Sequence, residues 1–163
     1  MPALLLSFSE ITFDKSRQTS HLAIMSIDWS MACTLGLRIE DVLNSKDYLG
    51  RTPLMRAVRY KKNSTVRLLL EQPALDLNLA DDKEGDTALH LAVIIDNAEG
   101  VRLLLADPRL DPNQKNNDGH APVMIAMFFC KVDILRELVA HQSVDLDTRN
   151  RLGWSLEEMA RAR

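Results

Sequence analysis

Histidine and cysteine are the residues of this sequence whose side chains are best suited to bind a transition metal. The chain has four histidines and two cysteines, namely His21, His90, His120, His141, Cys33 and Cys130. They show none of the short ligand spacings that zinc sites use. We therefore predict no metal site and no cofactor. We interpret His90 as a structural residue that hydrogen-bonds near Thr87, and the cysteines as small, packed apolar side chains.

The acidic run DDKEGD at 81–86 is a second candidate for chemistry, because clustered carboxylates can bind calcium. A calcium loop of the EF type needs ligands at alternate positions and a glycine at the sixth position. The stretch Asp76-x-Asn78-x-Ala80 breaks that order. We interpret the acidic run as a solvated loop.

Motifs of catalysis are missing from the sequence, which has no glycine-rich phosphate loop, no nucleophile elbow and no HExxH. We predict that the protein is not an enzyme. The formal net charge is −3, with both signs interspersed. Because nucleic-acid binding requires a basic stripe, we also predict no nucleic-acid partner.

The N-terminal sequence MPALLLSFSE is a poor secretory signal, because its apolar run is short and has no basic residues before it. The apolar stretch at 22–37 contains Asp28 and is shorter than the roughly 20 residues that span a membrane. The two cysteines have no CxxC spacing, which favours a reducing compartment. We predict an intracellular protein, cytoplasmic or nuclear, without membrane insertion.

A repeat organises the chain around these residues. The stretches GRTPLMRAV (50–58), GDTALHLAV (85–93), GHAPVMIAM (119–127) and GWSLEEMAR (153–161) recur at intervals of 34 or 35 residues. In the second copy Gly85 permits a tight turn, Thr87 can cap a helix, and Leu89, Ala92 and Val93 share one helical face. A polar break, a second apolar segment at 101–105 and an extended loop that begins near Pro108 complete the period.

Each period therefore predicts a turn, a helix, a short break, a second helix and a long loop. One pair of short helices cannot bury its own apolar face, so the copies must stack and share a core. This pattern of glycine, threonine, Ala-Leu-His-x-Ala, a leucine-rich helix and an Asp-x-Asn loop resembles the ankyrin repeat. The resemblance covers about residues 44–161. It implies an all-α solenoid of stacked antiparallel helix pairs, with hairpin-like finger loops and a concave face.

Several positions depart from the pattern of the family. The histidine of the motif is present only as His90, and its place is taken elsewhere by Met55, Met124 and Glu158. Ala121 replaces the threonine that caps the helix, at a cost of about 1 kcal/mol. The glycine expected between the two helices is replaced by Lys61, Asp96 and Cys130. We expect the third copy to be less stable than the second.

The ends of the chain follow different rules from the middle. We predict a flexible tail at 1–20, a degenerate capping helix region at 21–43, and a stack at 44–163 with about three full repeats and a partial C-terminal repeat. Ser155 and Glu158 form the pattern of a capping box, which starts a closing helix. We expect the protein to be monomeric on its own.

The resemblance implies that a protein partner binds the finger tips and the last turn of each inner helix. The inner-helix positions are Arg59, Tyr60, Ile94, Ile95, Phe128 and Phe129. The finger positions are Tyr48, Arg51, Lys83, Glu84, Asp86, Asn117, His120 and Trp154. The first set would form an exposed apolar strip, unless some of its side chains, such as Phe128, pack into the core.

Two functional readings follow from this. The first is a non-catalytic adaptor or inhibitor that displays a rigid concave groove and finger loops to a protein partner. The alternative is a regulatory or targeting segment of a larger enzyme, channel or signalling protein. A further expectation concerns Asn78, because the loop asparagine of the family is sometimes hydroxylated. Its simpler role is to hydrogen-bond the loop backbone.

Overall fold

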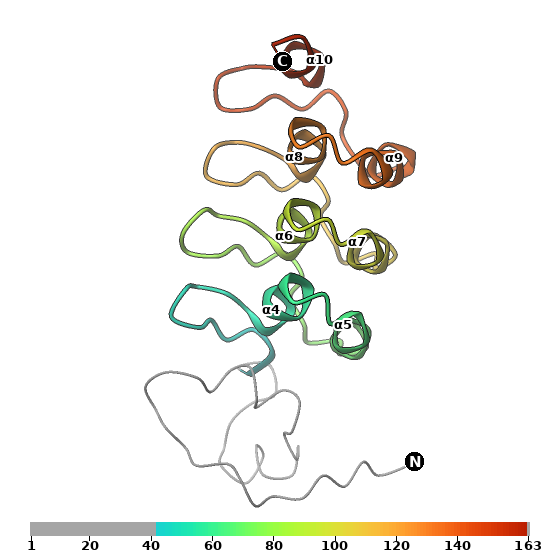
Figure 1. Ribbon diagram of the computed structural model, residues 1–163. Helices are drawn as coiled ribbons and strands as arrows, with labels where there is room; N and C mark the ends of the chain where they lie inside the picture. The colour runs from blue at the N-terminus through green and yellow to red at the C-terminus, as the bar shows by residue number, and fades with distance from the viewer. Residues whose placement is uncertain (1–41, 163) are drawn as a thin grey trace, which may run out of the picture.

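The structure, a computed structural model, describes residues 42–162. Within that range the chain forms helices joined by loops, and no strand is present. Helices α4, α6, α8 and α10 line up as an inner row beside the finger loops, while α5, α7 and α9 form an outer row (Figure 1). The helices are α4 (Pro53–Arg59), α5 (Asn63–Leu70), α6 (Ala88–Ile94), α7 (Ala98–Leu105), α8 (Pro122–Phe128), α9 (Val132–Ala140) and α10 (Leu156–Arg161).

This arrangement confirms the predicted all-α solenoid of helix pairs and finger loops. The tail predicted at 1–20, and nearly all of the capping region predicted at 21–43, lie outside the described residues. The described part contains three complete helix pairs and α10, which has no outer helix after it up to residue 162. The domain boundaries themselves stay a prediction.

The inner helices begin where the sequence places their caps. The side-chain oxygens of Thr52, Thr87 and Ser155 each accept a hydrogen bond from the backbone N–H three residues later, which starts α4, α6 and α10. The third residue of each helix bonds back to the cap, so all three are capping boxes. Ala121 precedes α8 without any side-chain cap, as the sequence predicts.

A continuous apolar core runs between the two rows of helices. Leu89, Ala92 and Val93 of α6 are fully buried, and Val101 and Leu104 of α7 face them. Each inner helix packs on the inner helix of the next repeat, and each outer helix on the next outer helix. Stacking therefore buries apolar faces that no single helix pair could cover.

Each finger loop is closed by one aspartate or asparagine, a feature that the motif analysis missed. Asp47 Oδ1 accepts hydrogen bonds from the N–H groups of Leu49 and Arg51 at 2.8 and 2.9 Å. Burial works to raise the pKa of Asp47, but these hydrogen bonds and one from the Arg56 guanidinium hold that pKa below its usual value. The same role falls to Asp81, Asn116 and Asn150 in the later fingers.

The interpretation of residues 81–86 as a solvated loop is wrong for two of the carboxylates. Asp81 is buried because its Oδ1 accepts from the N–H groups of Glu84 and Asp86 inside the finger. Asp86 is 5% exposed, and its Oδ1 accepts a 2.9 Å hydrogen bond from Asn116 Nδ2 of the next finger. Asp82 and Glu84 are exposed, so only part of the run faces solvent.

A second set of asparagines joins successive repeats. Asn78 donates from Nδ2 to the carbonyl of Arg109 at 2.9 Å and accepts on Oδ1 from the N–H of Asp111 at 2.8 Å. Asn44 and Asn113 make the same pair of bonds to the loop that follows them by one repeat. These side chains satisfy backbone groups of loops that have no strand partners.

Candidate functional site

Six residues at the carboxyl ends of the inner helices form one surface, which we call the helix-end strip: Arg59, Tyr60, Ile94, Ile95, Phe128 and Phe129. In each repeat the first of the pair ends the helix and the second is its C-cap. The next residue, Lys61, Asp96 or Cys130, has a positive φ of 53°, 59° or 52° and turns the chain toward the outer helix. This turn leaves the helix end facing outward.

The strip is most apolar at the level of α8. Phe128 and Phe129 are 54% and 50% exposed, and their rings meet edge to face with centroids 5.2 Å apart. Phe128 is therefore not a core residue. Ile94 is 37% exposed. Ile95 is only partly exposed because it packs against the core, so for this residue the alternative of packing into the core applies.

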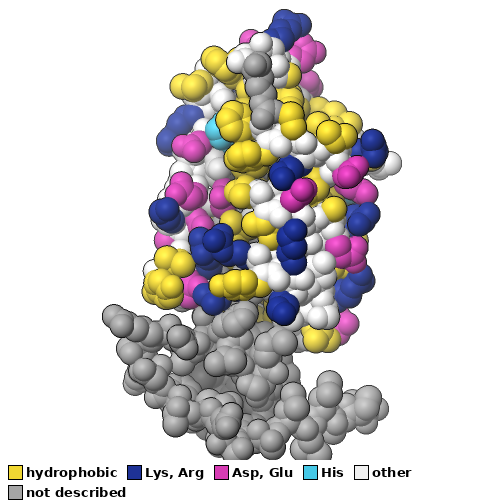
Figure 2. Space-filling view, viewed as in Figure 1, with side chains coloured by type: hydrophobic (Ala, Val, Ile, Leu, Met, Phe, Trp, Pro, Cys, Tyr) yellow, Lys and Arg dark blue, Asp and Glu magenta, His cyan; other side chains and the backbone are white. Residues whose placement is uncertain are grey.

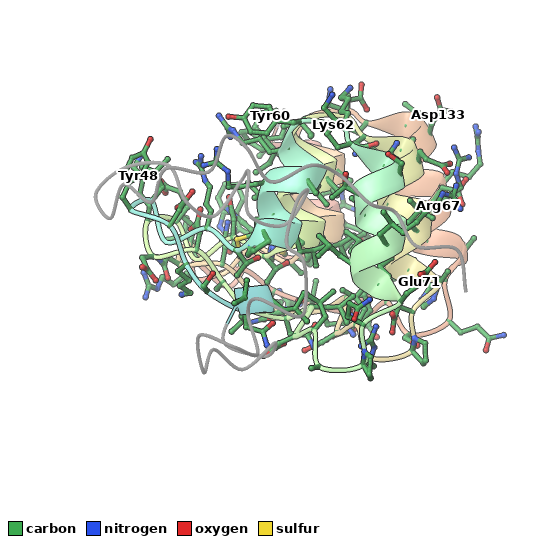
Figure 3. The ribbon with its side chains drawn as sticks, turned by 90° about the horizontal axis from the view of Figure 1, so that it is seen from below. Tyr48, Tyr60, Lys62, Arg67, Glu71 and Asp133 are labelled. Atoms are coloured by element: carbon green, nitrogen blue, oxygen red, sulfur yellow. The ribbon has the colours of Figure 1, made fainter. Side chains whose placement is uncertain are left out.

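The strip is basic at the level of α4. The Arg56 guanidinium lies 5.7 Å from the centre of the Tyr60 ring, a cation–π contact, and Arg59 is exposed beside it. Seen along the stack from below, Tyr60 and Lys62 lie at the same end of the helix pair, with Tyr48 off to the side on its finger (Figure 3). In the face viewed in Figure 2, hydrophobic side chains lie over the inner helices, with basic ones near the lower part.

The finger residues predicted to surround the strip differ in exposure. Tyr48, Lys83, Glu84, Asn117 and Trp154 are exposed. The structure leaves Arg51 and His120 partly buried.

Asn117 also holds its finger against the preceding one. Its backbone N–H donates to the Glu84 carbonyl at 2.9 Å and its Nδ2 to the Lys83 carbonyl at 3.2 Å. The placement of Asp86 on an exposed rim is wrong, because its carboxylate is buried by the bond from Asn116. On the fingers that precede α4, α6 and α8, four of the predicted residues are exposed, namely Tyr48, Lys83, Glu84 and Asn117. Trp154 is exposed on the last finger.

His90 is a fully buried residue of the core, as its structural interpretation predicts. Its Nδ1 accepts from the Thr87 N–H at 3.1 Å, and its Nε2 donates to the His120 carbonyl at 3.0 Å. Burial lowers the pKa of His90 below its ordinary value of 6.5, although the His120 carbonyl and the charges of Asp86 and Asp81 oppose this. The imidazole is therefore neutral near pH 7 and ties two repeats together.

Asn78 has both polar atoms of its side chain in the inter-repeat bonds described above, so its structural role is confirmed. Its hydroxylation stays a prediction. The loop-closing residues Asp47, Asp81, Asn116 and Asn150 were missed, yet a signal was present. Each precedes the finger glycine by three or four residues in every copy.

We also searched the described residues for a metal site and for a membrane-spanning helix. Among residues 42–162, no group of three or more histidine, cysteine, aspartate or glutamate side chains is placed to hold a metal ion. In the same part of the chain, no helix has both the length and the apolar character needed to cross a bilayer.

Comparisons with known proteins agree with this repeat architecture. Residues 20–116, more than half of the chain, match the family described as ankyrin repeats (3 copies). The chain is 45% identical over 53 residues to BTB/POZ domain-containing protein 1 of Schizosaccharomyces pombe, which covers 32% of this chain and 4% of that protein. It is 35% identical over 94 residues to human neurogenic locus notch homolog protein 4, which covers 58% of this chain and 5% of that protein. The chain therefore spans only a small part of the curated relatives it matches.

Proposed function

The chain belongs to the ankyrin repeat family, and we propose that it is a non-catalytic adaptor or inhibitor that holds a partner protein on the helix-end strip and the adjoining fingers. Ankyrin repeats in general are protein–protein interaction modules and are typically not enzymes. We also propose that the protein is intracellular and monomeric, binds no nucleic acid and does not insert into membranes.

One observation carries this proposal: apolar side chains are exposed one above another at successive helix ends. Ile94, Phe128 and Phe129 lie at the carboxyl ends of α6 and α8, two inner helices that pack directly on each other. Exposed aromatic rings cost free energy in water, and large residues of this kind supply most of the binding energy in protein interfaces. Single exposed apolar residues are ordinary, whereas a run of them on adjacent rigid elements indicates an interface.

Rigid display is the mechanism that the fold supports. The strip residues stand at the ends of stacked helices, of which α4 and α6 have capping boxes. The core, the His90 bond to the next repeat and the asparagine bonds between loops hold these helices in place. A partner that binds such a surface does not have to order it first, so less conformational entropy is lost on binding. The exposed finger residues, such as Tyr48 and Lys83, would add a polar rim that selects the partner.

A pull-down from native lysate tests the proposal. The variant Phe128→Ser/Phe129→Ser should lose the captured partner, yet keep the helical circular dichroism signal of the wild type, because both rings are half exposed. The matched control is Leu68→Ser/Val139→Ser, which removes two exposed apolar side chains from the outer helices α5 and α9. The control should retain the partner.

Equal capture by both variants would disprove a role for the strip, and unfolding of the phenylalanine variant would show that its rings support the core.

The alternative proposal is that the stack serves as a regulatory or targeting segment of a larger protein. Both curated relatives are far longer than this chain, which covers 4% and 5% of them. Locating the stop codon in the transcript separates a self-contained adaptor from such a segment.

A further inference from the structure

The three levels of the helix-end strip differ in charge. At α4 the chain reads Arg59-Tyr60-Lys61-Lys62, whereas the matching positions after α6 and α8 read Ile94-Ile95-Asp96-Asn97 and Phe128-Phe129-Cys130-Lys131. The strip therefore runs from a basic end with one aromatic ring to an apolar end with two. A surface with such a gradient recognises a partner by charge as well as by shape.

Two of the basic side chains at the α4 level are available to a partner. Arg56 is paired with Asp47 at 2.7 Å, and Lys61 donates to the Asp96 carbonyl at 3.0 Å. Arg59 and Lys62 are exposed, and within residues 42–162 neither has a carboxylate inside 4.0 Å.

Asp96, the acidic residue that follows the strip pair at the α6 level, is already paired with a lysine. The Asp96 carboxylate lies 3.2 Å from Lys131 Nζ, so it pairs away from the α4 level. The positive charge of Arg59 and Lys62 is therefore not compensated by the described part of the strip.

The need to terminate α4 does not by itself explain the basic residues Arg59 and Lys62. Arginine in the last turn of a helix interacts favourably with the helix dipole, and α4 has Arg56 and Arg59 there. The ends of α6 and α8, however, have no basic residue in the last turn and still form the same C-cap and the same positive-φ turn. Arg59 and Lys62 are thus not needed to end the helix.

We infer that the helix-end strip takes an acidic and apolar segment of the partner protein, with carboxylates on Arg59 and Lys62 and aromatic or aliphatic side chains on Ile94, Phe128 and Phe129. The inference rests on the proposed function and specifies the chemistry of the partner. Packed helices lie about 8–10 Å apart, so the α4 and α8 levels are roughly 16–20 Å apart. An extended chain covers that distance in about five or six residues.

A display library of random peptides of about sixteen residues, selected on the wild-type protein, tests the inference. We expect enriched peptides to carry two or more glutamates or aspartates about five residues from an aromatic or aliphatic pair. Binding of the best enriched peptide is then measured by fluorescence anisotropy. The variants Arg59→Glu/Lys62→Glu and Phe128→Ser/Phe129→Ser should each weaken binding at least tenfold, and added salt should weaken it for the wild type.

Two controls isolate the location and the sign of the charge. The variant Arg67→Glu/Arg136→Glu makes the same change of net charge on exposed positions of the outer helices and should bind like the wild type. A peptide with lysine in place of each acidic residue should bind Arg59→Glu/Lys62→Glu better than it binds the wild type. A short random-sequence RNA serves as a competing probe.

The outcomes separate this inference from the proposed function. Peptides released by the phenylalanine variant but kept by Arg59→Glu/Lys62→Glu would overturn the acidic assignment and leave the strip as a binding site. Peptides that neither variant releases would overturn both the acidic assignment and the strip as the binding site. Absence of any enriched peptide, enrichment without acidic residues, or tighter binding of the RNA than of the peptide would also overturn the inference.

Discussion

His90 Nε2 donates a 3.0 Å hydrogen bond to the backbone carbonyl of His120, one repeat further along the chain. A carbonyl can only accept, and Nδ1 of the same ring accepts from the Thr87 N–H at 3.1 Å. The ring is therefore the neutral tautomer with its proton on Nε2. One buried side chain thus caps its own helix and fixes the start of the next repeat.

Acid should weaken the fold through His90. The folded protein holds the pKa of His90 below 6.5, so the unfolded chain binds more protons as the pH falls below that value. The stability due to neutral His90 is complete above pH 6.5 and is lost as the pH falls toward the folded pKa. We expect the free energy of unfolding, measured by urea denaturation, to fall by up to about 1.4 kcal/mol per pH unit in that range.

The variant His90→Met is the control for this pH dependence, because methionine occupies the same position in the first and third repeats as Met55 and Met124. Met55 Sδ accepts from the Thr52 N–H at 3.4 Å, so methionine can complete the cap. The variant should show a flatter dependence of stability on pH between about 7 and 5. An unchanged slope would mean that other groups cause the acid sensitivity.

Restoring the missing cap of α8 should stabilise the third repeat. Ala121 has the same extended backbone as Thr87, with φ −78° and ψ 159° compared with −84° and 174°. The Met124 N–H now donates to the Ala121 carbonyl at 2.9 Å, and the hydroxyl of Ala121→Thr can take over this donor. The variant should therefore gain up to about 1 kcal/mol of unfolding free energy. Thermal and urea unfolding measure this, and Thr87→Ala should lose a similar amount. A loss in Ala121→Thr would show that the buried site cannot accommodate the added atoms.

Glycine should be preferred at the turn after α8. Cys130 has φ 52°, a left-handed conformation that costs residues with a Cβ about 1–2 kcal/mol. Since glycine also loses more entropy on folding, the variant Cys130→Gly should gain roughly 0.5–1 kcal/mol of stability. The variant Cys130→Ser keeps the Cβ and should not show this gain. Equal effects of the two changes would trace the result to the thiol and not to the backbone.

Two finger glycines should differ in their tolerance of alanine. Gly85 has φ 71°, and a Cβ there would lie 2.9 Å from the backbone nitrogen of Asn117 in the next finger. Gly153 has φ 80°, but a Cβ there would have no neighbour within 4 Å. Because alanine also loses less entropy on folding than glycine, we expect Gly153→Ala to cost roughly 0.5–1 kcal/mol, and Gly85→Ala to cost at least about 1 kcal/mol more. Equal losses in denaturant titrations would mean that the fingers move apart easily.

Local sequence was enough to predict the elements of each repeat. The order of glycine, cap, apolar face and polar break predicts the inner helices, because each of these signals acts within a few residues of the chain. Ala121 was correctly predicted to lack a cap, and Lys61, Asp96 and Cys130 do occupy the turn where the family has glycine. The strip positions at 59–60, 94–95 and 128–129 follow from the same register.

Contacts between repeats could not be predicted from the sequence. Asp86 looked like a solvated rim residue, because an aspartate beside a glycine is usually exposed, and it became buried through Asn116 of the next finger. Ile95 and Phe128 have similar hydrophobicity, yet one packs on the core and the other is exposed. This difference in exposure depends on how each helix end packs against the neighbouring helices.

The sequence by itself therefore determined the repeat, its helices and the family, since periodic apolar spacing and capping are local properties. The tertiary structure alone decided which polar groups are shared between repeats and which strip residues face solvent. The bonds from Asn78 to the loop at 109–111, and from His90 to His120, join residues about 30 positions apart. Such pairs meet only after the apolar faces have stacked, so burial of the core sets the geometry of the surface.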